Sequence, residues 1–139
     1  MTSDVFISYD GADAGECDRL RRLLEQELRL SVFVQRMDGA VDDGSAASVI
    51  VGERLRGRGA TFVVLTRHAL RSEWLPRAIE LAHGRHHRAV PVAFDDVSLR
   101  HATTDPDLAR HRPVDARRSD QDLVFGLWRC LYATLTVAA

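Results

Sequence analysis

The chain has 139 residues, of which 45% are hydrophobic and 28% charged, and its formal net charge is -1. This length suits one domain with a sizeable core, and this composition excludes disordered, collagen-like and disulfide-framework chains. A charge so close to zero provides no general attraction for a nucleic-acid backbone or an anionic membrane surface. We therefore expect neither as a partner.

The first ten residues lack the basic start and the apolar stretch of a signal peptide. No uncharged apolar run approaches the ~18 residues that a membrane helix needs. We therefore expect a cytoplasmic protein. A single domain is expected to occupy residues 1–139, either as a whole protein or as a piece of a larger one.

Two features of the residue usage exclude whole classes of site. All nineteen Lys and Arg residues are Arg, so the chain has neither a P-loop lysine nor a Schiff-base lysine. The two cysteines, Cys17 and Cys130, are too few and too far apart for a zinc site. In a cytoplasmic protein we expect them to be buried thiols without a disulfide.

Short apolar runs alternate with segments of helical periodicity along most of the chain. In order, the pattern predicts a strand at 5–7, a helix at 13–29, a strand at 31–34, a helix from the cap Ser45 to the glycines 57 and 59, a strand at 61–65, a helix from the cap Ser72 to Gly84, a strand at 89–94 and a helix at 120–133. Asp13 and Glu16 have the spacing of a capping box for the first helix.

Two polar stretches interrupt this alternation. Residues 35–44 show no periodicity, and a loop of that length is typical of a functional segment. Residues 95–116 are polar and irregular, with a possible fifth short strand near residues 113–114. Buried strands alternating with amphipathic helices predict an α/β fold, a flavodoxin-like parallel sheet of about five strands with helices on both faces.

In an open parallel sheet, ligands bind beyond the carboxyl ends of the strands, yet the common nucleotide motifs are absent there. No GxxxxGK[ST] run exists, and the glycines at 57 and 59 precede a strand instead of following one. A phospho-acceptor receiver domain is excluded because Thr66 and Arg67 stand after the third strand and no Lys is present. His83, His86 and His87 near a helix end complement its dipole, and we expect no metal site.

Several segments together resemble, in order and spacing, a Toll/interleukin-1 receptor (TIR) domain. They are the opening strand Asp-Val-Phe-Ile-Ser-Tyr at 4–9, Ser-Val-Phe-Val at 31–34, the loop to Gly44 and Ser45 that is similar to the family's BB loop, Ser-Glu-Trp at 72–74 and Val-Pro-Val at 90–92. The resemblance implies two activities. One is homotypic assembly with other TIR domains through the BB loop, and the other is cleavage of the nicotinamide-ribose bond of NAD⁺, which is a substrate and not a cofactor.

In the NAD⁺-cleaving members, a Glu four residues after the helix Trp supplies the negative charge that an oxocarbenium-like state requires. That position is Ala78 here, and Glu80 lies about 200° further round the helix. We therefore expect this chain to be nearly inactive. Either the protein is a natural pseudoenzyme that uses the fold for assembly, or Ala was introduced in place of a Glu.

The resemblance also implies a set of substrate-binding positions around residue 78. They are Ser8, Tyr9, Phe33, Gln35, Asp42, Gly44, Arg67 and Trp74. Asp43 stands where many members have Pro. For several of these residues a purely structural role remains open: Phe33 as a core residue, Ser8 and Tyr9 as turn formers, Trp74 as an anchor of its helix.

The leading hypothesis is a TIR NAD⁺ glycohydrolase or cyclase inactivated at position 78. The Arg-only composition favours a bacterial source, and the resemblance implies a role in immune signalling or antiphage defence. The alternative is a catalytically silent TIR interaction module. A third hypothesis is a flavodoxin-like nucleotide-binding protein of unrelated function.

Overall fold

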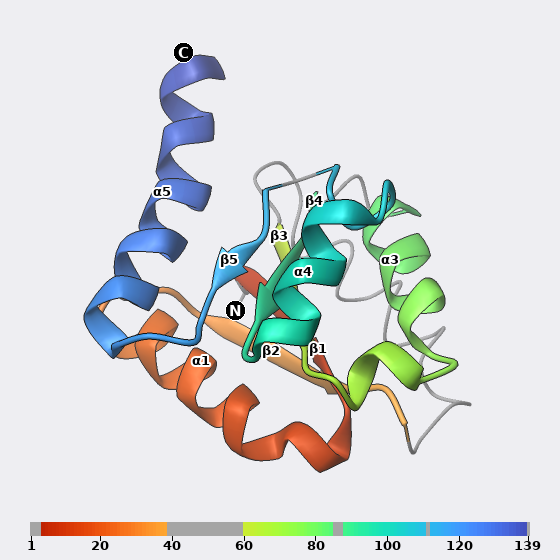
Figure 1. The fold of residues 1–139 in the computed structure, drawn as a ribbon. Helices are drawn as coiled ribbons and strands as arrows, with labels where there is room; N and C mark the ends of the chain where they lie inside the picture. Colours follow the sequence, from red (N-terminus) through yellow and green to blue (C-terminus); the bar gives the residue numbers. More distant parts are fainter. Residues whose placement is uncertain (1–3, 39–59, 85–87, 111, 139) are drawn as a thin grey trace.

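The computed structural model describes residues 4–38, 60–84, 88–110 and 112–138 (Figure 1). Strands and helices alternate along the chain. They are β1 (Val5–Tyr9), α1 (Ala14–Gln26), β2 (Val32–Arg36), β3 (Ala60–Leu65), α3 (Leu75–Gly84), β4 (Arg88–Ala93), α4 (Asp96–Thr104), β5 (Val114–Asp115) and α5 (Asp120–Ala138), with short 3-10 helices η1 (Gly11–Asp13) and η2 (Ala69–Arg71).

The five strands form one sheet in the order β2-β1-β3-β4-β5, and every neighbouring pair is parallel. The register is fixed near the centre, where Ile7 lies between Val34 on β2 and Phe62 on β3. This arrangement confirms the α/β fold with a parallel five-stranded sheet. It also brings the carboxyl ends of β1, β2 and β3 to one edge.

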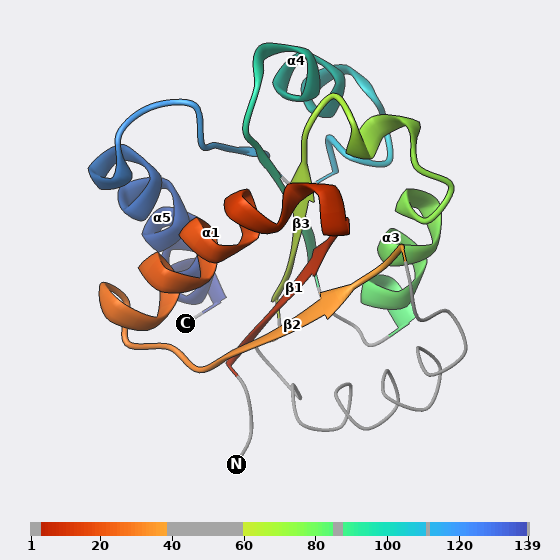
Figure 2. The ribbon, with the colours of Figure 1, turned by 90° about the horizontal axis from the view of Figure 1, so that it is seen from below.

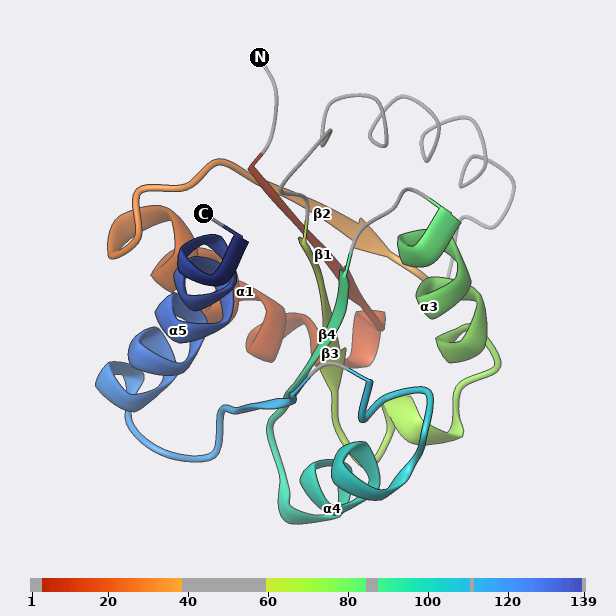
Figure 3. The same ribbon diagram turned by 90° about the horizontal axis from the view of Figure 1, so that it is seen from above.

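Helices cover both faces of the sheet, as seen from below and from above in Figures 2 and 3. On one face lie α1 and α5, and on the other lie α3 and α4. β3 contributes to both layers because its side chains alternate: Phe62 and Val64 pack with α1 and α5, whereas Val63 and Leu65 pack with α3 and α4. All four side chains are buried, which explains why β3 reads as an unbroken apolar run.

The predicted helix at 13–29 is shorter in the structure. α1 ends at Gln26, and Arg29 has a φ of 56°, a left-handed turn that directs the chain into β2. The expected capping role of Asp13 is wrong, because its side chain makes no cap hydrogen bond and instead accepts one from Thr66. The helix predicted to begin at Ser45 lies outside the described residues.

Residues 95–116 were expected to be irregular, but they contain α4. Its N-terminus has a capping box in which Asp95 accepts from the Ser98 N–H at 2.8 Å. Only Ser98 and Ala102 of α4 are buried, so the segment carries little apolar periodicity for a sequence reading to detect. The short fifth strand near residues 113–114 is confirmed as β5.

Three smaller features complete the fold. Ser72 ends η2 instead of capping α3, whereas Pro76 lies in the first turn of α3 as expected. Cys17 is buried and Cys130 half-buried, no disulfide joins them, and burial raises the pKa of the Cys17 thiol to about 12. Among the described helices, none is both long and apolar enough to span a bilayer.

Candidate functional site

A pocket of about 650 Å³ opens beside the carboxyl ends of β1 and β2, facing the start of α3. Its walls come from the turn after β1, from the end of β2 and from the η2–α3 segment. The described residues that line it are Asp10, Ala12, Gln35, Arg36, Met37, Asp38, His68, Ser72, Glu73, Trp74, Arg77 and Leu81. We call this the strand-edge pocket.

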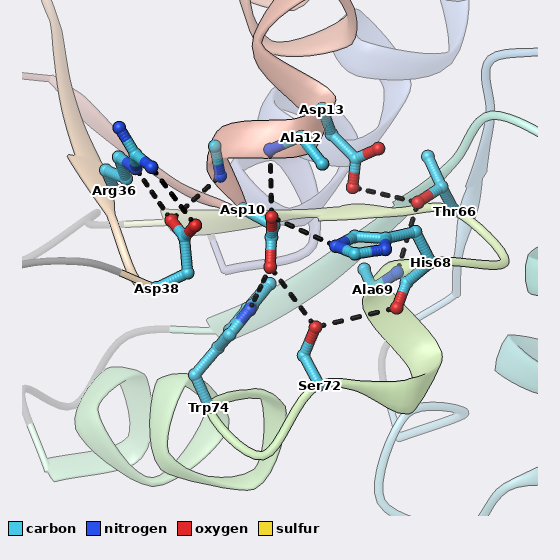
Figure 4. Close-up of polar contacts among 11 residues, drawn as sticks. Asp10, Ala12, Asp13, Arg36, Asp38, Thr66, His68, Ala69, Ser72 and Trp74 are labelled. Carbon is cyan, nitrogen blue, oxygen red and sulfur yellow. Dashed lines mark hydrogen bonds and ion pairs between the residues drawn. The ribbon is translucent and has the colours of Figure 1, made fainter.

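The side chain of Asp10 contacts residues from two walls of the strand-edge pocket, the turn after β1 and the η2–α3 segment (Figure 4). One carboxylate oxygen, Oδ1, accepts from the Ala12 N–H at 2.9 Å and lies 3.1 Å from Nε2 of His68. The other, Oδ2, accepts from Nε1–H of Trp74 at 2.9 Å and from the Ser72 hydroxyl at 3.3 Å. One side chain on the β1 edge therefore fixes three side chains of the segment that leads into α3.

Asp10 is only 4% exposed. Burial by itself opposes ionisation, but the hydrogen bonds from Ala12, Trp74 and His68 outweigh it, so the pKa of Asp10 lies below its ordinary value. The carboxylate is thus charged at neutral pH. Because donors engage both oxygens, Asp10 acts as an organiser of the pocket wall and not as a nucleophile.

A second buried carboxylate lies behind this wall. Asp13 accepts from the Thr66 hydroxyl at 2.8 Å, and the same hydroxyl oxygen accepts from the Ala69 N–H at 3.1 Å. These two hydrogen bonds connect the end of β3 to η1 and η2 (Figure 4). Burial raises the pKa of Asp13, with the Thr66 hydrogen bond acting in the opposite direction.

A third polar group forms the rim next to β2. Asp38 accepts from Nε of Arg36 at 2.8 Å and from the Gly11 N–H at 2.8 Å. The hydrogen bond from Arg36 lowers the pKa of Asp38 to about 2. A Cβ at Gly11 would lie 2.5 Å from the Arg36 guanidinium carbon, so a larger residue there would displace the Arg36 side chain from this position.

The strand-edge pocket also contains polar groups without a partner in the described part of the chain. Oε1 of Gln35 is buried and accepts no hydrogen bond from any described residue. Arg77 is exposed on the first turns of α3, and no ion pair joins it to another described side chain. A ligand in the pocket would therefore meet an unused acceptor on β2 and an unused cation on α3.

The structure brings only some of the residues implied by the family resemblance to this pocket. Trp74 and Gln35 line it. Four others lie elsewhere, and Asp42 and Gly44 lie outside the described residues. Ser8 is buried in β1, Tyr9 packs against the core under α1, Phe33 stacks on Phe6 with ring centroids 5.4 Å apart, and the exposed Arg67 donates its N–H to Asp95.

Position 78 is part of the apolar layer under α3. Ala78 is 1% exposed and packs in one cluster with Val63 and Leu65 of β3. The side chains of α3 that face the pocket are Arg77 and Leu81. Glu80 is exposed and does not line the pocket, in agreement with its expected position on the helix.

Three residues of the pocket wall, Asp10, His68 and Arg77, are not among the site residues that the sequence predicts. Nothing in the sequence pattern around Asp10 shows that residues 62 and 64 positions away bond to it. A carboxylate immediately after a strand at the binding edge of a parallel sheet was the available signal.

Among the described residues, no cluster of three or more His, Cys, Asp or Glu side chains could hold a metal ion. Of the three histidines near the end of α3, only His83 is described. Its Nε2 is buried and has no hydrogen-bond partner among the described residues.

The fold and the site define an open-sheet α/β domain with a ligand-sized pocket at the carboxyl edge of its strands. The family model of the TIR domain matches residues 5–125. The chain belongs to the TIR domain family. No curated protein matches it.

Solved structures of TIR domains share this fold. The TIR domain of the Toll-related receptor TRR-2 from Hydra magnipapillata has a TM-score of 0.63 and 18% identity, over 97% of this chain and 99% of that one. The TIR domains of the activated Roq1 resistosome, which directly recognizes the pathogen effector XopQ, have a TM-score of 0.53 and 17% identity. The match covers 99% of this chain and 100% of that one.

Proposed function

We propose that this chain is a TIR domain of the NAD⁺-cleaving type that binds NAD⁺ in the strand-edge pocket and cleaves it very slowly because position 78 holds Ala. One observation carries the proposal: the pocket wall around Trp74 is held in place by hydrogen bonds, but the carboxylate expected at position 78 is absent. Trp74 is fixed by Asp10 at the pocket, and Ala78 lies one helical turn further on, buried beneath α3 next to the pocket wall and without a carboxylate. NAD⁺ is the substrate, and no cofactor or metal takes part.

The pocket suits a dinucleotide in size and in chemistry. Its volume of about 650 Å³ falls within the ~300 to 1,000 Å³ usual for small-molecule sites. Trp74 offers an aromatic surface for a sugar or base, Arg77 a cation for the pyrophosphate, and Gln35 an acceptor for a hydroxyl or amide N–H. Arg36 is less available to a phosphate because Asp38 already engages it.

The reaction breaks the bond between ribose C1′ and the nicotinamide nitrogen. The bonding electrons leave with nicotinamide, which becomes neutral, and the ribose carries the positive charge until it is captured. Capture by water gives ADP-ribose and a proton, and capture by an adenine nitrogen gives a cyclised product. A fixed negative charge beside C1′ therefore stabilises the transition state.

None of the acids in the described pocket wall replaces the missing one. Donors already occupy both oxygens of Asp10, and Asp38 is paired with Arg36 and the Gly11 N–H. Glu73 is exposed, where water screens its charge. Losing one preorganised electrostatic group typically costs ~10² to 10³ in rate, and we expect at least that loss here.

The test is nicotinamide release from NAD⁺ by three versions of the chain: unmodified, Ala78→Glu and Ala78→Gln. The Gln variant is the matched control, since it adds nearly the same volume to a buried position without the charge. The protein is assayed at a concentration high enough for it to assemble. Under this condition we expect only the Ala78→Glu variant to release nicotinamide at a measurable rate. The catalytic role of position 78 would be refuted if both variants fold and bind NAD⁺ but neither releases nicotinamide.

The second candidate is a TIR interaction module without enzymatic activity. The observation that favours it is the packing of Ala78, which is 1% exposed among apolar side chains, as expected for a small structural residue. This candidate predicts that the folded chain associates with itself and does not bind NAD⁺. Assembly through the BB loop would involve Asp42 and Gly44.

We place either activity in immune signalling, in a bacterial cell's defence against phage. The Arg-only composition supports a bacterial source. A structural neighbour, the Roq1 resistosome, recognizes a pathogen effector. Loss of phage protection in cells that carry the Ala78 form, with protection in cells that carry Ala78→Glu, would support the enzymatic version of this role.

A further inference from the structure

Asp10 places a buried negative charge in the wall of the strand-edge pocket. Its residue is 4% exposed, and its hydrogen bonds keep the carboxylate ionised at neutral pH. Donors of the protein itself engage both of its oxygens (Figure 4). A ligand therefore meets this charge through space, without a hydrogen bond to it, and burial makes the interaction stronger than it would be in water.

The other charged side chains of the pocket wall are paired or exposed to water. Asp38 forms an ion pair with Arg36 at 2.8 Å. Glu73 and Arg77 are exposed, so water screens their charges. His68 offsets the charge of Asp10 only while its imidazole is protonated. In the described part of the pocket wall, and with a neutral imidazole, the buried charge is therefore that of Asp10.

The indole of Trp74 is electronically coupled to this charge. Its Nε1–H donates to Oδ2 of Asp10 at 2.9 Å, and both residues line the pocket. A carboxylate at that distance polarises the N–H bond and increases the electron density of the indole ring. The face of an indole attracts cations even without such a neighbour. Asp10 and Trp74 therefore act in the same direction, because both favour a positive charge in the pocket beside them.

We propose that Asp10 is a specificity-determining residue that makes the strand-edge pocket select a positively charged pyridinium ring over an uncharged ring of the same size. This inference rests on the proposed binding of NAD⁺. The exposed Arg77, three residues after Trp74, supplies the opposite charge for the pyrophosphate. The pocket then has the polarity of the nucleotide, with its negative charge at the buried wall and its cation on the exposed side.

The experiment compares NAD⁺ with NADH, which has the same adenosine and pyrophosphate but an uncharged dihydropyridine ring. Calorimetric titrations at pH 8 give both dissociation constants for the unmodified chain and for Asp10→Asn, with folding verified by circular dichroism. We expect the unmodified chain to bind NAD⁺ roughly tenfold more tightly than NADH. Asp10→Asn keeps the size of the side chain and removes its charge, so the ratio should fall to about threefold or less.

Glu80→Gln is the matched control, because it also converts an acid into its amide, at an exposed position of α3 that does not line the pocket. It should keep the ratio of the unmodified chain. The ratio separates specificity from a purely structural role of Asp10, since a loosened pocket wall would weaken the binding of both nucleotides by the same factor.

A second measurement needs neither a variant nor a dinucleotide. The cation 1-methylnicotinamide and uncharged nicotinamide are titrated into the unmodified chain at pH 8, and the indole N–H signals are followed by NMR. The chain has two tryptophans, and Trp128 lies on α5, away from the pocket. We expect the Trp74 signal to respond to both compounds, with the cation binding roughly threefold more tightly or better.

The proposal is overturned if the unmodified chain binds NAD⁺ and NADH equally well, or if Asp10→Asn weakens both by the same factor. Failure of the proposed function gives a different result, in which neither dinucleotide binds. The NMR titration then decides: a preference for 1-methylnicotinamide at Trp74 supports the role of Asp10, whereas equal binding of the two compounds, or no binding, overturns it.

Discussion

Replacing Asp10 by Asn tests whether this carboxylate organises the strand-edge pocket. An Asn keeps one acceptor oxygen and turns the other position into an N–H₂ donor. Whichever way it is oriented, one N–H that can only donate, that of Ala12 or that of Trp74, then faces another donor. The most costly case is the Trp74 indole N–H, because that side chain is 9% exposed.

The magnitude follows from the burial of these groups. A buried donor left without an acceptor costs about 1 to 3 kcal/mol of unfolding free energy. For a domain of this length, 1 kcal/mol corresponds to roughly 4 °C in Tm, so we expect Asp10→Asn to lower Tm by about 4 to 12 °C at pH 7. Asp107→Asn, at an exposed carboxylate, should leave Tm nearly unchanged.

The difference in Tm between the unmodified chain and Asp10→Asn should also depend on pH. The pKa of Asp10 lies below its ordinary value of 3.8 in the folded chain, so its charge stabilises the fold above that pH and the contribution is lost as pH falls through the folded value. Thermal unfolding followed by circular dichroism should show a constant Tm difference above about pH 5, narrowing in more acidic buffer. A variant as stable as the unmodified chain at pH 7 would refute the role of Asp10.

The remaining predictions concern Asp13 and Arg77. Burial raises the pKa of Asp13, so its charged form opposes folding. Asp13→Asn should be at least as stable as the unmodified chain at pH 7. The Tm of the variant minus that of the unmodified chain should increase as pH rises from 4. A clearly lower Tm of the variant at pH 7 would contradict this. Arg77→Ala should weaken NAD⁺ binding by calorimetry roughly tenfold, whereas Glu80→Ala should not; equal affinities would remove Arg77 from the site.

The order of strands and helices could be predicted because each repeats a pattern that its own neighbours along the chain reveal. β3 reads as an apolar run since both of its faces are covered, and α1 shows a buried stripe of leucines. α4 escaped prediction because it buries only Ser98 and Ala102 and depends on the cap at Asp95. Local pattern identifies an element when the element buries a wide apolar face.

The candidate site was predictable only in part. Trp74 and Gln35 could be placed by family resemblance, and the structure puts both in the pocket wall. The organising role of Asp10 could not be predicted, because it depends on bonds to Ser72 and Trp74 that form only when β1 and the η2–α3 segment meet in the fold. The same is true of Asp13, whose expected helix cap is replaced by a bond to Thr66.

We propose that the strand-edge pocket binds NAD⁺ and that the unmodified chain hardly cleaves it. A calorimetric titration of NAD⁺ into the unmodified chain, followed by a nicotinamide assay of the same sample, tests both halves together. We expect saturable binding, with NAD⁺ recovered almost intact. Absence of binding to the folded chain, or rapid release of nicotinamide, would contradict it.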